Sequence, residues 1–137
     1  MGYEMRDALL KNTRALPASA SASVYSAGID LGHGTRGDFV ANAELLISAP
    51  AVNATMAPDT RTFTYFLQHD TDPAFGTVAT LAALQIVQTG ADSAGAAAAT
   101  ARFRPQVDVK RYVRLAITSG GSTADASAVS ATLELLL

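Results

Sequence analysis

Two stretches near the end of the chain decide the fold: residues 111–119, RYVRLAITS, and residues 128–137, AVSATLELLL. Every second side chain is apolar from Val113 to Ile117 in the first stretch and from Val129 to Leu137 in the second. A period of two places alternate side chains on one face of a β-strand. The connection between the stretches opens with two glycines, so we expect a long-looped β-hairpin.

The same period of two recurs upstream. We expect further strands at residues 23–31, 39–49, 61–69 and 100–104, and over the second half of 78–89, where a helix is the alternative. The apolar side chains expected to face inward are Tyr25, Ala27, Ile29, Leu31, Leu45, Ile47, Phe63, Tyr65 and Leu67. Seven or eight short strands separated by turn residues predict an all-β fold, either a two-sheet β-sandwich or a barrel.

The first residues follow a different pattern. Apolar side chains at helical spacing within Tyr3 to Leu16 predict a short helix, which Pro17 ends. Residues 17–23, PASASAS, then form an Ala/Ser spacer. We therefore divide the chain into an N-terminal arm with its spacer, residues 1–23, and a single β-sandwich domain, residues 24–137. The arm is too short to be helical alone, so we expect it to order on a partner. The side chains expected to contact that partner are Tyr3, Leu9, Leu10 and Arg14.

The composition bounds the function. The 137 residues are enough for one domain, and 49% of them are apolar, with much alanine and no tryptophan. The net charge of −2 lacks the concentrated positive field that nucleic-acid binding requires. No apolar run has the length of a membrane span or a signal peptide, and cysteine is absent. We expect a soluble protein without nucleic-acid or membrane partners, made in the cytoplasm.

Residues that suggest chemistry are few. The two histidines, His33 and His69, lie in or beside predicted loops, without the arrangement that nucleophilic catalysis needs. The run from His69 to Asp72 has metal-ligand types, but a turn whose side chains bond back to the backbone explains it better. Arg36-Gly37-Asp38 matches the integrin-binding tripeptide, which a glycine-rich turn also explains. We expect no enzyme activity, no metal and no cofactor.

The outward-facing positions carry mainly Ala, Ser, Thr and Gly. Small side chains lose little rotamer freedom on contact, so such a surface is suited to binding other proteins. A protein that needs only to stay soluble usually carries more charge. The sequence therefore favours a component of a protein assembly.

Both ends of the chain carry recognisable segments: Arg102-Phe103, the 109–115 stretch VKRYVRL and the Gly-Gly connection near one end, and the 7–10 segment DALL and the 29–32 segment IDLG near the other. In these features the chain resembles the Bordetella-phage-type family of capsid cement, or decoration, proteins. The resemblance implies a jelly-roll-like β-sandwich that forms a homodimer or homotrimer. It also implies a place on the outer surface of an icosahedral virion, where the protein clamps neighbouring subunits of the major capsid protein. The alternative function is a carbohydrate- or cell-binding β-sandwich, such as an adhesin or fibre domain, although sugar sites usually present exposed Trp or Tyr.

Overall fold

The computed structural model describes residues 11–19, 21–31, 43–91, 93–106, 108–121 and 124–136. Within these ranges the regular structure is entirely β, and none of the described residues forms a helix that could cross a membrane. The strands are β1 (Lys11–Ala15), β2 (Ser23–Tyr25), β3 (Ile29–Asp30), β4 (Glu44–Ala49), β5 (Thr62–Asp70), β6 (Ala79–Thr89), β7 (Ala99–Phe103), β8 (Tyr112–Gly120) and β9 (Ser130–Leu136).

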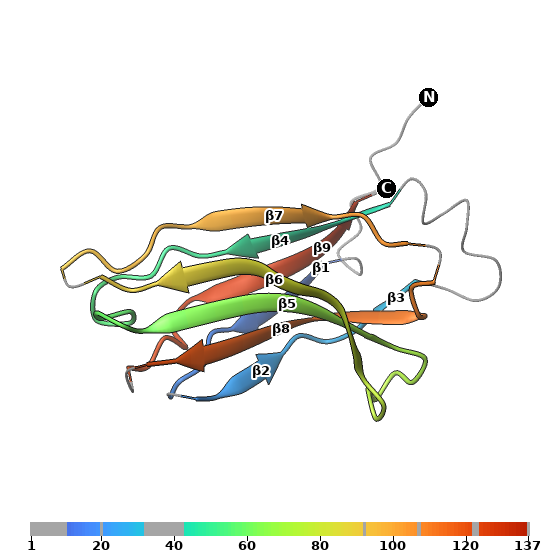
Figure 1. Ribbon diagram of the computed structural model, residues 1–137, viewed down its shortest axis with the longest axis horizontal. Helices are drawn as coiled ribbons and strands as arrows, with labels where there is room; N and C mark the ends of the chain where they lie inside the picture. The colour runs from blue at the N-terminus through green and yellow to red at the C-terminus, as the bar shows by residue number, and fades with distance from the viewer. Residues whose placement is uncertain are drawn as a thin grey trace.

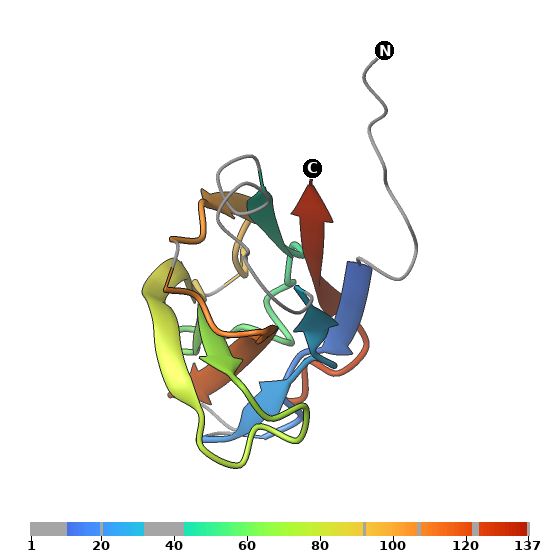
Figure 2. The ribbon, with the colours of Figure 1, turned by 90° about the vertical axis from the view of Figure 1, so that its right-hand side faces the viewer.

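The strands form two antiparallel sheets that pack face to face (Figures 1 and 2). Sheet A has four strands in the order β1-β9-β4-β7. Sheet B has five, in the order β2-β8-β5-β6, with β3 also paired to β8. Sequence neighbours such as β1 and β2, or β8 and β9, therefore lie in opposite sheets. The predicted β-sandwich is confirmed.

The core lies between the two sheets. Alternation along each long strand sends one set of side chains inward, and these are almost fully buried. The innermost are Leu45, Ile47, Leu133 and Leu135 from sheet A and Phe63, Tyr65, Leu67, Leu115 and Ile117 from sheet B. The period-two pattern thus predicted the buried positions of the central strands correctly.

A buried polar network also joins the two sheets. The side chain of Gln88, on β6, accepts a hydrogen bond of 2.6 Å from the hydroxyl of Tyr65. Its amide nitrogen donates to the carbonyl oxygens of Pro50 and Ala97, at 2.8 and 2.9 Å. Pro50 follows β4 and Ala97 precedes β7, and these two strands are paired at that end, so a single amide connects sheet B to one end of the β4–β7 pair of sheet A. Burial raises the pKa of Tyr65, which keeps its hydroxyl protonated as the donor.

The expected hairpin between the last two strands is wrong. β8 pairs with β2, β3 and β5 in sheet B, whereas β9 pairs with β1 and β4 in sheet A. The connection between them crosses from one sheet to the other. Both strands have one strongly apolar face, and in a sandwich those faces cover each other across the core instead of lying side by side.

The helix expected within Tyr3 to Leu16 is wrong where the structure describes it. Lys11–Ala15 is a strand, paired in register with residues 130–134 of β9. A short segment with weak helical preference takes the conformation that completes the edge of a sheet. Residues 3–10 lie outside the described residues.

The Ala/Ser spacer is held against the sandwich. The hydroxyl of Ser119 donates to the carbonyl oxygen of Ser19 at 2.7 Å, and the backbone N–H of Ser119 donates to Ala22 at 2.9 Å. The guanidinium of Arg61, which is fully buried, also donates to Ser19. Residues 11–19 and 21–23 are therefore packed together with the domain that we expected to begin at residue 24.

The expected strand 23–31 is divided. Ser26 interrupts it between β2 and β3, because its hydroxyl accepts the hydrogen bond of the Leu115 N–H at 3.0 Å. The interruption changes the alternation: Ile29 and Leu31 are buried as expected, but Tyr25 faces outward and is 40% exposed. The ambiguous region 78–89 is a strand along almost its whole length, β6.

Candidate interaction surface

Part of the outward side of sheet B, over β2, β8, β5 and β6, carries no charged side chain. Register and alternation place side chains from four neighbouring strands on it. We call this surface the sheet B face; its residues are Ser23, Tyr25, Thr62, Thr64, Phe66, Val87, Thr89, Ala116 and Thr118. None of these nine side chains is ionisable at neutral pH. A charge-depleted centre is typical of protein–protein interfaces.

The sheet B face is built from rows that cross the strands. In one row Ala116 lies in register between Tyr25 and Phe66 and is fully buried although it points outward. In the next row Thr118 lies between Ser23 and Thr64, and the hydroxyls of Ser23 and Thr118 are 3.2 Å apart. Thr64 pairs in turn with Val87, whose side chain is 54% exposed. Small hydroxyl-bearing side chains lose little entropy when a partner covers them.

An arginine held between aromatic rings borders the sheet B face. The guanidinium carbon of Arg114 lies 4.0 Å from the ring centre of Tyr25 and 4.4 Å from that of Phe75. Its Nε donates to Gln68 at 2.9 Å, and burial lowers its pKa. A Cβ on Gly28 would lie 2.9 Å from the Phe75 ring, so the glycine leaves room for that ring. Arginine and aromatic side chains ordered in this way are typical of the residues that dominate interface energies.

Ion pairs lie on the outward side of sheet A, whereas the ion pair of sheet B, between Arg111 and Asp30 of β3, lies outside the sheet B face. Glu44 contacts Arg102 at 2.9 Å and Arg104 at 3.2 Å, and both arginine side chains are largely exposed. The hydrogen bond from Arg102 is the main cause of the lowered pKa of Glu44. Exposed pairs of this kind contribute little to stability. Arg102 thus lies on β7 of sheet A and Arg104 directly after it, while Arg114 lies on β8 of sheet B.

At one end of the sandwich, the side chain of His69 on β5 holds the connection that leads into β8. His69 Nδ1 accepts a hydrogen bond of 3.1 Å from the backbone N–H of Lys110. The ring borders a hollow of about 300 Å³ that Phe103 and Asp108 also line. Burial lowers the pKa of His69, and the nearby Lys110 adds to this effect. Protonation would place a hydrogen on Nδ1 and remove the acceptor that holds the 108–111 connection.

This arrangement predicts acid sensitivity. Because the folded-state pKa of His69 lies below its ordinary value, the neutral ring stabilises the fold fully above about pH 6.5. That contribution is lost as the pH falls through the folded-state pKa. We expect the free energy of unfolding to decrease between pH 7.5 and 5, measured by urea denaturation. The variant His69→Asn keeps a hydrogen-bond acceptor that does not titrate, and it should show a weaker decrease. An equal decrease in both proteins would contradict this role.

The adjoining run that resembled a metal site is a turn. Oxygen atoms of Asp70 accept the backbone N–H groups of Asp72 at 3.1 Å and Thr77 at 2.8 Å. Burial acts to raise the pKa of Asp70, but these N–H groups and that of Thr71 outweigh it, and the pKa is lowered. Among the described residues there is no group of three or more potential metal ligands. The interpretation as side chains bonding back to the backbone matches these contacts.

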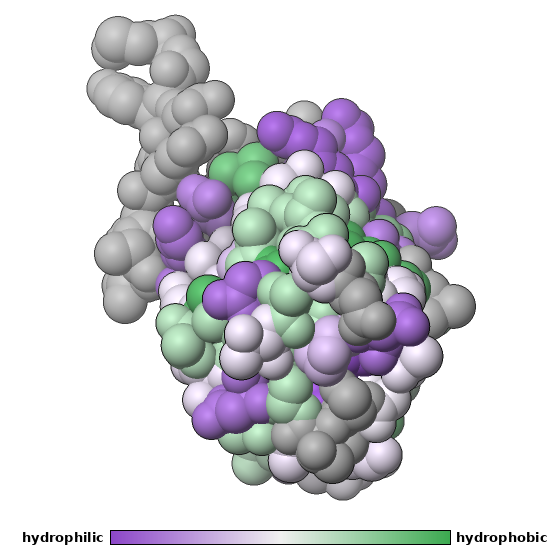
Figure 3. All heavy atoms as spheres, turned by 90° about the vertical axis from the view of Figure 1, so that its left-hand side faces the viewer, coloured by the Kyte–Doolittle hydropathy of each residue, from purple (hydrophilic) through white to green (hydrophobic). Residues whose placement is uncertain are grey.

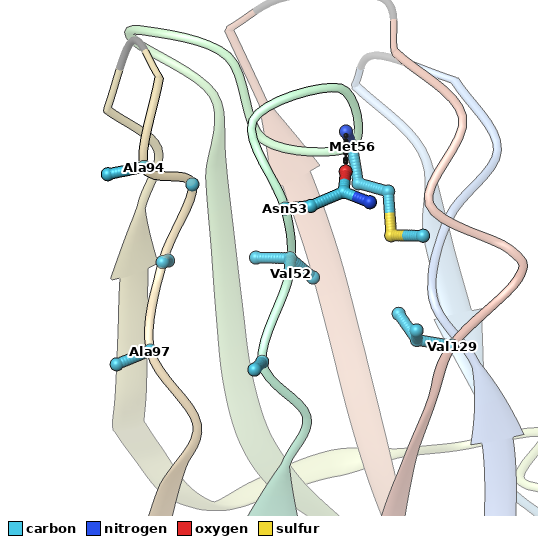
Figure 4. A pocket seen from close by; sticks show the side chains of 9 residues that line it. Val52, Asn53, Met56, Ala94, Ala97 and Val129 are labelled. Atoms are coloured by element: carbon cyan, nitrogen blue, oxygen red, sulfur yellow. Dashed lines mark hydrogen bonds between the residues drawn. The ribbon is translucent and has the colours of Figure 1, made fainter.

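At the opposite end of the sandwich, the surface mixes weakly hydrophobic and hydrophilic residues (Figure 3). An apolar hollow of about 560 Å³ lies at this end, among the loops (Figure 4). Val52 and Ala96 pair across it through two backbone hydrogen bonds of 3.0 and 2.9 Å. Met56 extends towards Val129, and Asn53 accepts the Met56 N–H at 3.0 Å (Figure 4). Its walls are mainly alanine and valine, without an ionisable side chain. The hollow is an apolar depression that offers no catalytic group.

Of the four residues predicted to bind a partner, the structure describes Arg14 alone. Arg14 lies on β1, exposed and opposite Ala131 at an edge of sheet A. Tyr3, Leu9 and Leu10 lie outside the described residues, as do His33 and Arg36-Gly37-Asp38. The sheet B face was missed, although its threonines stand out in the alternation of 61–69. The pairing of β5 with β8 and β6 had no local signal.

Comparisons with known proteins give only distant likenesses. No protein-family model matches the chain, and no curated protein matches it. The PBSX exported protein XepA aligns with 93% of the chain, at 17% identity and a TM-score of 0.47. The chain spans about a third, 34%, of the length of XepA.

Two other solved structures cover most of the chain. A protein of the Cowpea Mosaic Virus empty virus-like particle aligns with 98% of this chain and 80% of its own, at 8% identity and a TM-score of 0.44. The carbohydrate-binding module CBM32 of AlyQ, in complex with 4,5-unsaturated mannuronic acid, aligns with 96% of this chain and 88% of its own, at 15% identity and a TM-score of 0.37. Likenesses of this size identify neither a family nor a function for the chain.

Proposed function

We propose that the chain is a capsid cement, or decoration, protein that binds the outer surface of an icosahedral phage head and bridges neighbouring major capsid subunits. The observation that carries the proposal is the uncharged sheet B face. A partner can cover this surface without removing water from a charged group, which would be costly. The resemblance of both ends of the sequence to the cement family supports the same function.

The order of the strands also supports this proposal. Along the chain, β1, β4 and β7 of sheet A are each followed by a strand of sheet B, and β9 returns to sheet A between β1 and β4. This order, β1-β9-β4-β7 against β2-β8-β5-β6, is that of a double-sheet jelly roll. This order supports the jelly-roll-like architecture that the sequence resemblance implied. Because fold alone does not determine function, the proposal depends on the sheet B face.

The aromatic side chains do not favour the alternative of sugar binding. Sugar sites use open ring faces, and Arg114 covers one face of both Tyr25 and Phe75. Phe66, which also points outward, is only partly exposed beside Ala116. We therefore place protein binding first. Glycan-array binding by the purified protein would reverse this order.

The proposed mechanism is mass action. A protein that binds the assembled shell, but not its separated subunits, shifts the equilibrium towards the shell. We expect purified protein to bind mature heads of its phage in a saturable and regular ratio, measured by co-sedimentation and quantified on gels. Separated capsid subunits are the control and should bind much more weakly. Binding only to tails, or no saturation on heads, would contradict the proposal.

A further inference from the structure

We propose that the free edge of β6 pairs with β6 of a second copy of this chain, in antiparallel orientation, and joins two sheets B into one. The role of this dimer on the phage head rests on the proposed function. The structural argument for the dimer rests on the edge of β6 alone. Identical strands that pair about a twofold axis are antiparallel, and the resulting interface is closed.

β6 is the edge strand without the usual protection against pairing. The described sandwich has edge strands β1 and β7 in sheet A, and β2, β6 and the two-residue β3 in sheet B. Charged side chains, proline and short length normally block such edges. β6 spans eleven residues, ATLAALQIVQT, with no charge and no proline. β1 carries Lys11 and Arg14, β7 carries Arg102, and β2 is only three residues long.

The hydrogen-bond pattern shows which backbone groups face the open edge. The N–H of Gly90 donates to the carbonyl oxygen of Arg61 at 2.7 Å, so this pair is a hydrogen-bonded one. Such pairs alternate with non-bonded pairs along an antiparallel ladder. Val87 and Thr89, opposite Thr64 and Thr62, belong to the non-bonded pairs. Their N–H and C=O groups therefore point away from β5, towards the edge.

The side chains of the same segment are suited to a second copy. Val87 is the most exposed large apolar side chain in the described structure, at 54%. It lies at the edge of the sheet, where a second strand would cover it. The pairing segment is Ile86–Thr89, because register shifts interrupt the ladder between Tyr65 and Gln68, opposite the earlier part of β6.

The absence of charge on β6 favours a second copy of the chain as the partner of this edge. In any antiparallel register, β6 against β6 places no charged side chain opposite another. Self-pairing of β1 or β7 would instead bring cationic side chains close to each other, which is destabilising. The uncharged β6 is thus the long edge whose charge is compatible with its own copy.

The test uses sedimentation velocity of the full chain over a concentration series. We expect wild-type protein to dimerise and Val87→Pro to raise the dissociation constant at least tenfold. Proline at position 87 removes an N–H that points to the open edge and leaves the ladder with β5 intact. Val87→Lys places like charges near each other at the twofold axis and should have a similar effect. If circular dichroism shows that Val87→Pro is misfolded, the dissociation constant of Val87→Lys tests the inference instead.

Thr64→Lys is the matched control. It adds the same charge to the same face, in register with Val87 but one strand away from the edge, and should leave dimerisation unchanged. A wild-type monomer or trimer, or dimers that resist both Val87 changes, would overturn the inference. Loss of the dimer in Thr64→Lys would do the same, because it would indicate packing through the face. Head binding is measured separately, so dimers that fail to bind heads would contradict the proposed function alone.

Discussion

Replacing Gln88 with alanine is expected to destabilise the protein more than any other single polar change in the core. The substitution removes three buried hydrogen bonds at once, those with Tyr65, Pro50 and Ala97. It leaves the Tyr65 hydroxyl and two carbonyl oxygens without this partner, and each such group costs about 1–3 kcal/mol when it stays buried. We expect a loss of about 3 kcal/mol or more in the free energy of unfolding, measured by urea denaturation.

Gln85→Ala is the control for that measurement. Gln85 lies on the same strand, but its amide donates to the carbonyl oxygen of Ala83 in an exposed hydrogen bond. We expect this change to stay within about 0.5 kcal/mol of wild type, as is usual for surface positions. Equal effects of the two substitutions would show that the Gln88 network does not connect the sheets.

The second large effect is expected at the sheet B face. Thr64→Lys places a charge at the centre of a surface that is otherwise free of charge. Covering that charge without a partner for it costs several kcal/mol, so head binding should weaken about a hundredfold or more. The matched control is Thr132→Lys, because Thr132 is an equally half-buried outward threonine between Thr13 and Ser48 of sheet A. Equal binding by the two variants would contradict the assignment of the face.

The strands were predictable because each carries its signal locally. Alternation along Phe63 to Leu67 and Val113 to Ile117 follows from one buried face, whichever sheet the strand joins. The sheet that each strand joins was not predictable. β8 and β9 read as a hairpin because a glycine-rich connection suggests a turn, and local sequence does not distinguish a turn from a crossing between sheets.

Two local expectations failed for physical reasons that the structure makes plain. Lys11–Ala15 has weak helical spacing, yet pairing with β9 completes its backbone hydrogen bonds and determines its conformation. Tyr25 was expected inward because it shares the phase of Ile29, and Ser26 changes that phase by taking a ladder hydrogen bond with its side chain. Long-range partners decide both cases.

The candidate surface was only partly predictable. The small polar side chains indicated a protein-contact surface, and Thr62 and Thr64 are legible in the sequence as outward positions. Thr62 and Thr64 lie beside Thr118 and Val87 because β5 pairs with β8 and β6, and this pairing connects residues far apart in the chain. The stacking of Arg114 between Tyr25 and Phe75 depends on the pairing of β2 with β8 and on the loop after β5.

The central claim is that the chain stabilises the assembled head, and the temperature at which heads release their DNA tests it most directly. Heads stripped of the protein should release DNA at a lower temperature than complete heads. Adding back wild-type protein or Thr132→Lys should restore the higher temperature, and adding Thr64→Lys should not. Stripped heads that keep their DNA to the same temperature as complete heads would contradict the account.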